Sequence, residues 1–135
     1  MKKVVVALGL VGSLIAAGPA VADEDDWTGF YLGIDAADGS LDYLSIVPLG
    51  DGRFDIRIAV SGHSMCSGAG AAVVHATGRL EDDRLVREEG ELVCDGADKV
   101  AHPGVVYELD EDEKFLATQA PDDGRMLYFH RLSED

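Results

Sequence analysis

The chain has 135 residues and a formal net charge of −15, with 26 acidic and 11 basic side chains. This length predicts one domain with a single hydrophobic core. Such a negative surface repels nucleic acid and anionic lipid, so neither is expected as a partner.

Residues 1–22 have the pattern of a secretory signal peptide. Lys2 and Lys3 precede an apolar run, and the segment ends at Ala22 in the cleavage pattern Ala-x-Ala. The apolar run is shorter than the roughly 20 residues that a membrane-spanning helix needs. We therefore predict an exported protein, periplasmic or extracellular, whose mature domain spans residues 23–135 without a membrane span.

The rest of the chain alternates short β-forming segments with turn residues. Residues 54–60 show this best, because Phe54, Ile56 and Ile58 share one face and charged residues occupy the other. Residues 69–76 also fit a short helix, and the charges of residues 84–94 depart most from a strand pattern. Strands are predicted over residues 27–35, 41–49, 54–60, 71–80, 84–94, 104–109, 114–119 and 125–132.

Cys66 and Cys94 are the only cysteines, and an even pair in an exported chain favours a disulfide. Closing that loop stabilises the fold by roughly 3.5 kcal/mol in the chain-entropy model. The bond would tie a predicted loop, residues 61–70, to the end of the fifth strand. A second predicted loop covers residues 95–103.

Eight short strands without a confident helix predict either a sandwich or a closed barrel, and closure removes exposed strand edges. We expect an all-β fold, a small antiparallel up-and-down barrel of about eight strands with one disulfide. A barrel of this size is either filled by side chains or holds one small ligand.

This plan, together with Trp27 beside Gly29 at the start of the first strand, resembles the calycin group, which includes the lipocalins and avidins. The order Trp27-Thr28-Gly29 differs from the Gly-x-Trp that is usual in lipocalins. The resemblance implies a lipocalin-like barrel and transfers no ligand-binding residue.

The stretch from Trp27 to Gly33, WTGFYLG, also resembles the opening of small outer-membrane barrels of the Omp25/opacity type. Strands of such barrels need ~9–11 residues and an outward apolar band. Most predicted strands here are shorter, and residues 84–91 carry five charges. A soluble barrel is therefore preferred over a small outer-membrane barrel.

The segment Gly62-His63-Ser64-Met65-Cys66 invites two chemical interpretations. As a nucleophile elbow it lacks the final glycine and the α/β sheet that the motif needs, so no catalytic residue is expected and the protein is not predicted to be an enzyme. His63, Met65 and Cys66 are ligand types that suit copper, but a disulfide would remove the thiolate and the other histidines are scattered.

Acidic residues at Asp35, Asp38 and Asp42, or at Asp110 and Asp112, do not match the twelve-residue calcium loop. Turn chemistry accounts for several of them. No specific metal site and no cofactor is therefore predicted, and weak calcium binding by the acidic surface stays open.

Two functions remain open. The first is non-catalytic binding of a small apolar ligand inside the barrel, in contact with Phe54, Ile56, Tyr107 and Tyr128. The second is a secreted protein-interaction or inhibitor module with an unknown protein partner, acting through the loops of residues 61–70 and 95–103.

Overall fold

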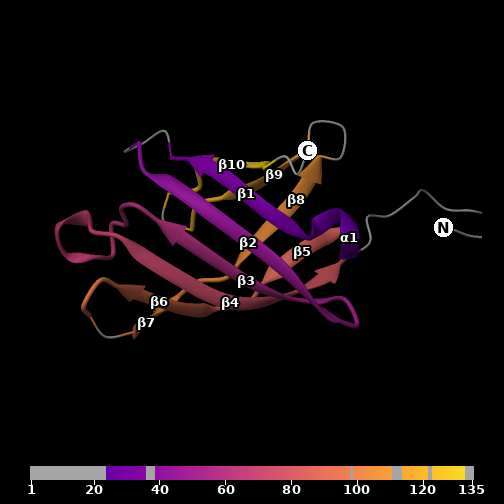
Figure 1. The fold of residues 1–135 in the computed structure, drawn as a ribbon, viewed down its shortest axis with the longest axis horizontal. Coiled ribbons are helices and arrows are strands. Elements are labelled where there is room, and N and C mark those ends of the chain that lie inside the picture. Colours follow the sequence, from indigo (N-terminus) through magenta and orange to yellow (C-terminus); the bar gives the residue numbers. More distant parts are fainter. Residues whose placement is uncertain (1–23, 36–38, 98, 111–113, 122, 133–135) are drawn as a thin grey trace, which may run out of the picture.

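A computed structural model describes residues 24–35, 39–97, 99–110, 114–121 and 123–132. The predicted signal peptide of residues 1–22 lies outside these residues, as do Asp38 and Asp112 of the calcium argument. The elements are α1 (Glu24–Trp27), β1 (Gly29–Ile34), β2 (Leu41–Gly50), β3 (Arg53–Val60), a 3₁₀ turn η3 (Ser67–Ala69), β4 (Ala72–Glu81), β5 (Arg84–Arg87), β6 (Gly90–Cys94), β7 (Lys99–His102), β8 (Val105–Asp110), β9 (Phe115–Gln119) and β10 (Met126–Arg131) (Figure 1).

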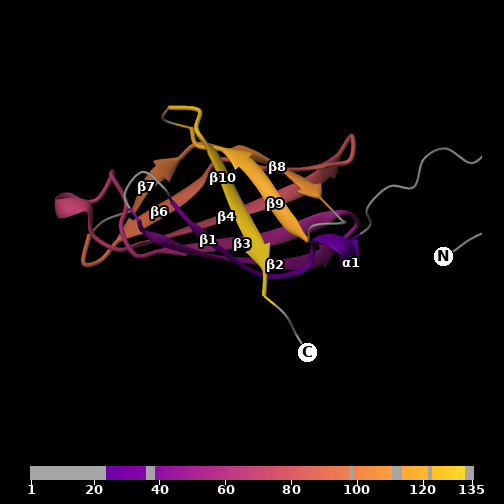
Figure 2. The same ribbon diagram turned by 90° about the horizontal axis from the view of Figure 1, so that it is seen from above.

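Eight of the strands form a closed antiparallel barrel, which confirms the predicted fold class. The ring runs β3-β2-β1-β10-β9-β8-β5-β4, and the pairing of β3 with β4 closes it. Most neighbours in the ring also follow one another in sequence. The chain meanders around the barrel, and β9 and β10 cross the face opposite β3 and β4 (Figure 2). No helix among the described residues is long and apolar enough to cross a membrane.

The predicted fifth strand is divided into β5 and β6 by a β-bulge. Gly78 of β4 pairs with Arg87 of β5, and His75 of β4 pairs with Glu91 of β6. The step from Gly78 to His75 is three residues, whereas the step from Arg87 to Glu91 is four, so the segment that joins β5 to β6 contains one extra residue. Gly90 is required at the bulge, because a Cβ there would lie 2.5 Å from the carbonyl oxygen of His75.

The predicted loop of residues 95–103 is partly wrong, because it contains β7. β7 continues toward β8 past Pro103 and Gly104. The pairing of β5 with β8 and the pairing of β6 with β7 have the same register, so no residue is inserted between the two pairs. β7 was not predicted because its four residues are too few to show an alternating pattern and turn residues flank them.

The bulge between β5 and β6 and the break at Pro103 and Gly104 between β7 and β8 decide which side chains face inward. Leu85 and Arg87 point into the barrel before the bulge, and Leu92 does so after it. Uninterrupted alternation would have placed Glu89 and Glu91 inside instead. On the partner strands, His102 and Tyr107 both face inward.

The disulfide between Cys66 and Cys94 is confirmed, with the two Cα atoms 5.6 Å apart. It ties the loop of residues 61–70, which contains η3, to the end of β6. The strand interpretation of residues 71–80 is correct, since β4 covers them from Ala72 onward.

One end of the barrel is closed by α1 and the other is rimmed by the loop after β3, as Figures 1 and 2 both show. Trp27 of α1 is completely buried, and the Tyr31 hydroxyl donates a hydrogen bond to its carbonyl oxygen at 2.7 Å. The core of this closed end also contains Phe54, Ile56 and Leu116. We call the opposite end the open end.

Candidate functional site

A pocket of about 440 Å³ occupies the open end of the barrel. Inward-facing side chains of the strands form its walls, and the loops after β3 and β9 form its rim. Its apolar wall consists of Ile58, Val60, Val74, Leu127 and Phe129.

Arg87 brings a positive charge into this interior. Its side chain lies on β5 just before the bulge, and the residue is only 2% exposed. Nη2 donates to the carbonyl oxygen of Pro103 at 2.5 Å and contacts Nδ1 of His102 at 2.8 Å, while Nε has no hydrogen-bond partner among the described residues. The guanidinium is thus held in place by neutral acceptors.

His102 is fixed as a neutral imidazole. Nδ1 of His102 lies 2.8 Å from Nη2 of Arg87 and 3.2 Å from the carbonyl oxygen of Pro103. Arginine can only donate, so the shorter contact makes Nδ1 an acceptor and places the ring proton on Nε2. Burial, with smaller contributions from Arg87 and His63, lowers the pKa of His102 from 6.5 to about 4. The histidine therefore presents a hydrogen-bond donor at neutral pH.

Tyr107 of β8 also lines the pocket and is buried. Burial raises the pKa of its hydroxyl, and the positive charge of the neighbouring Arg87 opposes this rise. The carboxylate of Asp42, at the start of β2, raises the pKa further. The hydroxyl remains protonated at neutral pH.

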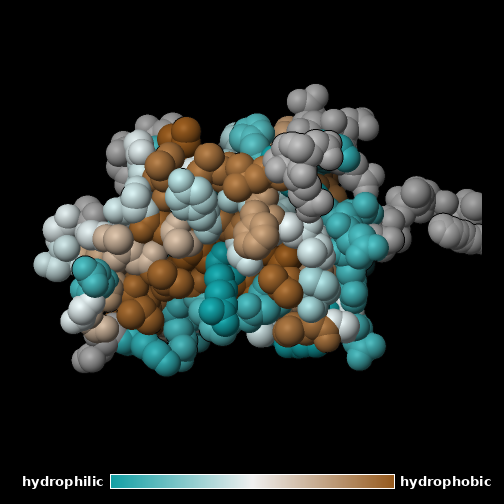
Figure 3. All heavy atoms as spheres, in the orientation of Figure 1, coloured by the Kyte–Doolittle hydropathy of each residue, from teal (hydrophilic) through white to brown (hydrophobic). Residues whose placement is uncertain are grey.

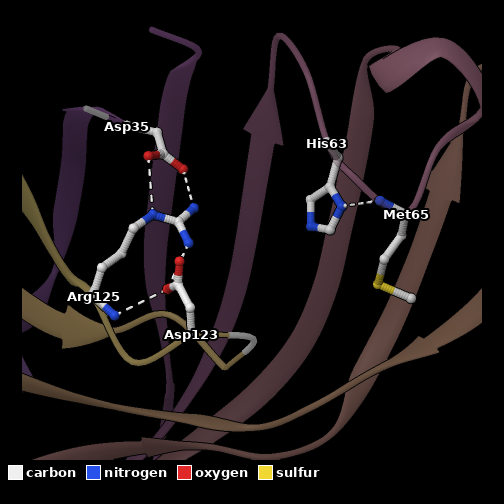
Figure 4. Close-up of polar contacts among 5 residues, drawn as sticks. All are labelled: Asp35, His63, Met65, Asp123 and Arg125. Atoms are coloured by element: carbon white, nitrogen blue, oxygen red, sulfur yellow. Dashed lines mark hydrogen bonds and ion pairs between the residues drawn. The ribbon is translucent and has the colours of Figure 1, made fainter. Parts of the chain in front are cut away.

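The rim carries an ion-pair network that Figure 4 shows together with His63 and Met65. Arg125 contacts Asp35 through Nε and Nη2, and its Nη1 donates to Asp123 at 2.8 Å. These hydrogen bonds raise the pKa of Arg125, so its charge is permanent. The network joins the end of β1 to the connection between β9 and β10.

The wall between β8 and β9 is incomplete. These strands pair only over Glu108–Asp110 and Phe115–Ala117 within the described residues. Beyond that, the Thr118 hydroxyl donates to the carbonyl oxygen of Val106 at 2.7 Å. Thr118 lines both the pocket and an outer groove of about 570 Å³, so this seam separates the two.

The predicted ligand contacts lie in different places. Tyr107 lines the pocket, whereas Phe54 and Ile56 face inward but belong to the closed-end core and not to the pocket wall. The prediction that Tyr128 faces the interior is wrong, because it is 47% exposed on the outer face. Its neighbour Phe129 takes the inner position on β10 and packs edge-on against Tyr107, with ring centroids 6.2 Å apart.

Arg87 and His102 were not predicted from the sequence as parts of the site. Both flank interruptions that a simple alternating pattern does not show. The available signals were Gly90 and the pair Pro103-Gly104, which interrupt strand-forming segments and are typical of bulges.

The copper interpretation meets two obstacles. Cys66 is in the disulfide and offers no thiolate. The structure does bring His63 to His102, with ring centroids 5.4 Å apart. However, Nδ1 of His63 accepts a hydrogen bond from the backbone N–H of Met65 at 3.1 Å, and Nδ1 of His102 accepts one from Arg87. Each neutral ring therefore carries its proton on Nε2, and this nitrogen then has no lone pair for a metal ion.

Within the described residues, no group of three or more His, Cys, Asp or Glu side chains is placed to hold a metal ion. No protein-family model matches the chain, and neither a curated protein nor a solved structure matches it. The site must therefore be interpreted from its own geometry.

Proposed function

We propose that this protein is a non-catalytic β-barrel that binds one small, chiefly apolar molecule at its open end. The pocket carries the proposal, because its volume of about 440 Å³ is typical of small-molecule sites. Such sites combine apolar walls with a few convergent polar groups. The wall of the pocket and the buried Arg87 and Tyr107 have this composition.

We also propose that the protein acts after export. The disulfide supports this, because such bonds persist mainly in oxidising compartments.

The closed eight-stranded barrel with a pocket at one end likewise supports the lipocalin-like resemblance.

The test uses two neighbouring valines on β4. Val74 lines the pocket, whereas Val73 is exposed on the outer face. Binding of an apolar probe, 1-octanol, is measured by calorimetry for the wild type, Val74→Phe and Val73→Phe, with melting temperatures recorded for all three. We expect Val74→Phe to abolish binding and Val73→Phe to preserve it. Absence of octanol binding to the wild type, or equal binding by all three proteins, would contradict the proposal.

A second candidate function is a protein-interaction or inhibitor module, and the outer surface favours it. Phe30 and Ile34 of β1 are 64% and 63% exposed, and Tyr43 of β2 and Tyr128 of β10 are exposed beside them. Figure 3 shows apolar residues gathered on the face that includes β1 and β2. Clustered apolar side chains on a surface are typical of interaction sites. This surface lies on strands, and not on the two loops that the sequence analysis considered.

Native mass spectrometry of protein purified from its own host separates the two candidates. A bound small molecule that Val74→Phe removes favours the pocket. A bound protein that Phe30→Ser removes, with the pocket empty, favours the interaction module.

A further inference from the structure

Arg87 is a buried charge that makes no direct ion pair within the described residues. Within the part of the chain that the structure describes, no carboxylate oxygen lies within ion-pair distance of its guanidinium; its contacts are His102, Pro103 and Tyr107, all of them neutral. Burying a charge is costly unless it is paired and hydrogen-bonded. Arg87 lines the pocket, from which a negative group of a ligand can reach it.

Two histidines near Arg87 add hydrogen-bond donors to the pocket wall. His102 carries its proton on Nε2, and so does His63 on the rim, because both rings accept hydrogen bonds at Nδ1. Both histidines line the pocket. Arg87 and the two histidines thus present hydrogen-bond donors, which suit a ligand that supplies acceptors.

We propose that the ligand carries a carboxylate, which pairs with Arg87 while its apolar body contacts the wall of Val60, Val74 and Leu127. This inference rests on the proposed function and names the ligand class for the same pocket. Arginine and carboxylate match in geometry, because two parallel N–H groups can meet two oxygens. Nε of Arg87 is buried and has no hydrogen-bond partner among the described residues, so the hydrogen bonds present do not use every donor of this guanidinium.

Asp42 also lines the pocket and sets a limit on anion affinity. Its carboxylate already acts on Tyr107, which contacts Arg87. A bound carboxylate would be repelled by Asp42 and attracted by Arg87, and the contact with Arg87 is stronger because it is direct and hydrogen-bonded. Asp42→Asn should therefore bind octanoate about threefold more tightly than the wild type.

The experiment compares octanoate, 1-octanol and octylammonium at pH 7.4 by calorimetry. We expect the wild type to bind octanoate at least tenfold more tightly than octanol and to bind octylammonium least. Arg87→Met should remove the preference for octanoate, so that this variant binds octanoate no more tightly than octanol. Arg84→Met, on the exposed face of the same strand, makes the same change in net charge and should keep the preference.

The outcomes separate this inference from the proposed function. Equal binding of octanoate and octanol by the wild type overturns the carboxylate assignment while the binding function stands. Binding of neither probe contradicts both. The wild-type comparison needs no variant to fold, and Arg87→Lys, which retains the charge, should keep part of the preference if Arg87→Met does not fold.

Discussion

The two ends of the barrel each contain an inward-facing arginine, and the surroundings of the two differ. At the closed end, Arg131 donates to the carbonyl oxygens of Asp26 and Thr28 and to the Tyr31 hydroxyl, and its guanidinium lies 5.1 Å from the Tyr31 ring centroid. Arg131 also remains partly exposed, so water solvates its charge.

At the open end, Arg87 is almost fully buried against His102 and Pro103, and it also forms part of the wall of a pocket. The arginine of the closed end completes a packed structure, whereas that of the open end leaves an unfilled space with a charge on its wall. We infer that the closed end serves stability and the open end serves recognition. The following predictions test that division.

Trp27→Ala should produce the largest loss of stability. Trp27 is fully buried in the closed-end core, and truncating such a side chain costs about 3–5 kcal/mol. Urea unfolding measures the loss. Tyr43→Ala, at a residue 51% exposed on the outer face, is the control and should change stability far less. Equal effects of the two substitutions would show that α1 is not part of the core.

Replacing Cys66 and Cys94 together by serine should lower the free energy of unfolding by about 3 kcal/mol, because the unfolded chain gains freedom. The bond anchors the rim of the open end, so octanol affinity should fall as well. Urea unfolding of the wild type with and without reductant is the matched comparison. A free energy of unfolding that reductant does not change contradicts the prediction.

His102 should make the open end sensitive to acid. Its pKa of about 4 in the folded state lies below the ordinary 6.5, so the unfolded chain binds the proton more readily. Its contribution is complete above pH 6.5 and is lost as the pH falls toward 4, by about 2 kcal/mol after allowance for solvent screening. The wild type should lose this much more stability than His102→Gln over that range, as measured by urea unfolding. Parallel pH profiles for the two proteins would refute the assignment.

Tyr31 should make the closed end sensitive to alkali, with a smaller effect. Burial raises its pKa from 10 to about 12, so the folded state releases this proton less readily than the unfolded chain. The contribution is complete below pH 10 and is lost as the pH rises toward 12, by about 1 kcal/mol. Thermal unfolding of Tyr31→Phe should lack this part of the alkaline loss. An identical alkaline profile for Tyr31→Phe and the wild type would show that this proton is not involved.

The sequence predicted the barrel and the disulfide because both depend on patterns that it displays directly. Alternation at residues 54–60 and turn residues between strands determine the strand order, and two cysteines allow only one intramolecular pair. The site was harder to predict, since the bulge at residues 88–90 reverses which side chains face inward. Tyr128 was predicted to face inward because it lies on the same face of the strand as Met126 and His130. In the structure, Phe129 on the opposite face packs against Tyr107, and this contact places Tyr128 outside.

The seam between β8 and β9 is the part of the barrel wall with a short ladder within the described residues. A barrel closed by complete ladders of backbone hydrogen bonds empties only through its ends or by unfolding. Here a side-chain hydrogen bond from Thr118 to Val106 bridges strands that diverge beyond their short ladder. Opening it is a local fluctuation that costs far less than global unfolding. Under the proposed function, Thr118→Val should therefore speed the release of a bound molecule, because it removes this hydrogen bond from the wall.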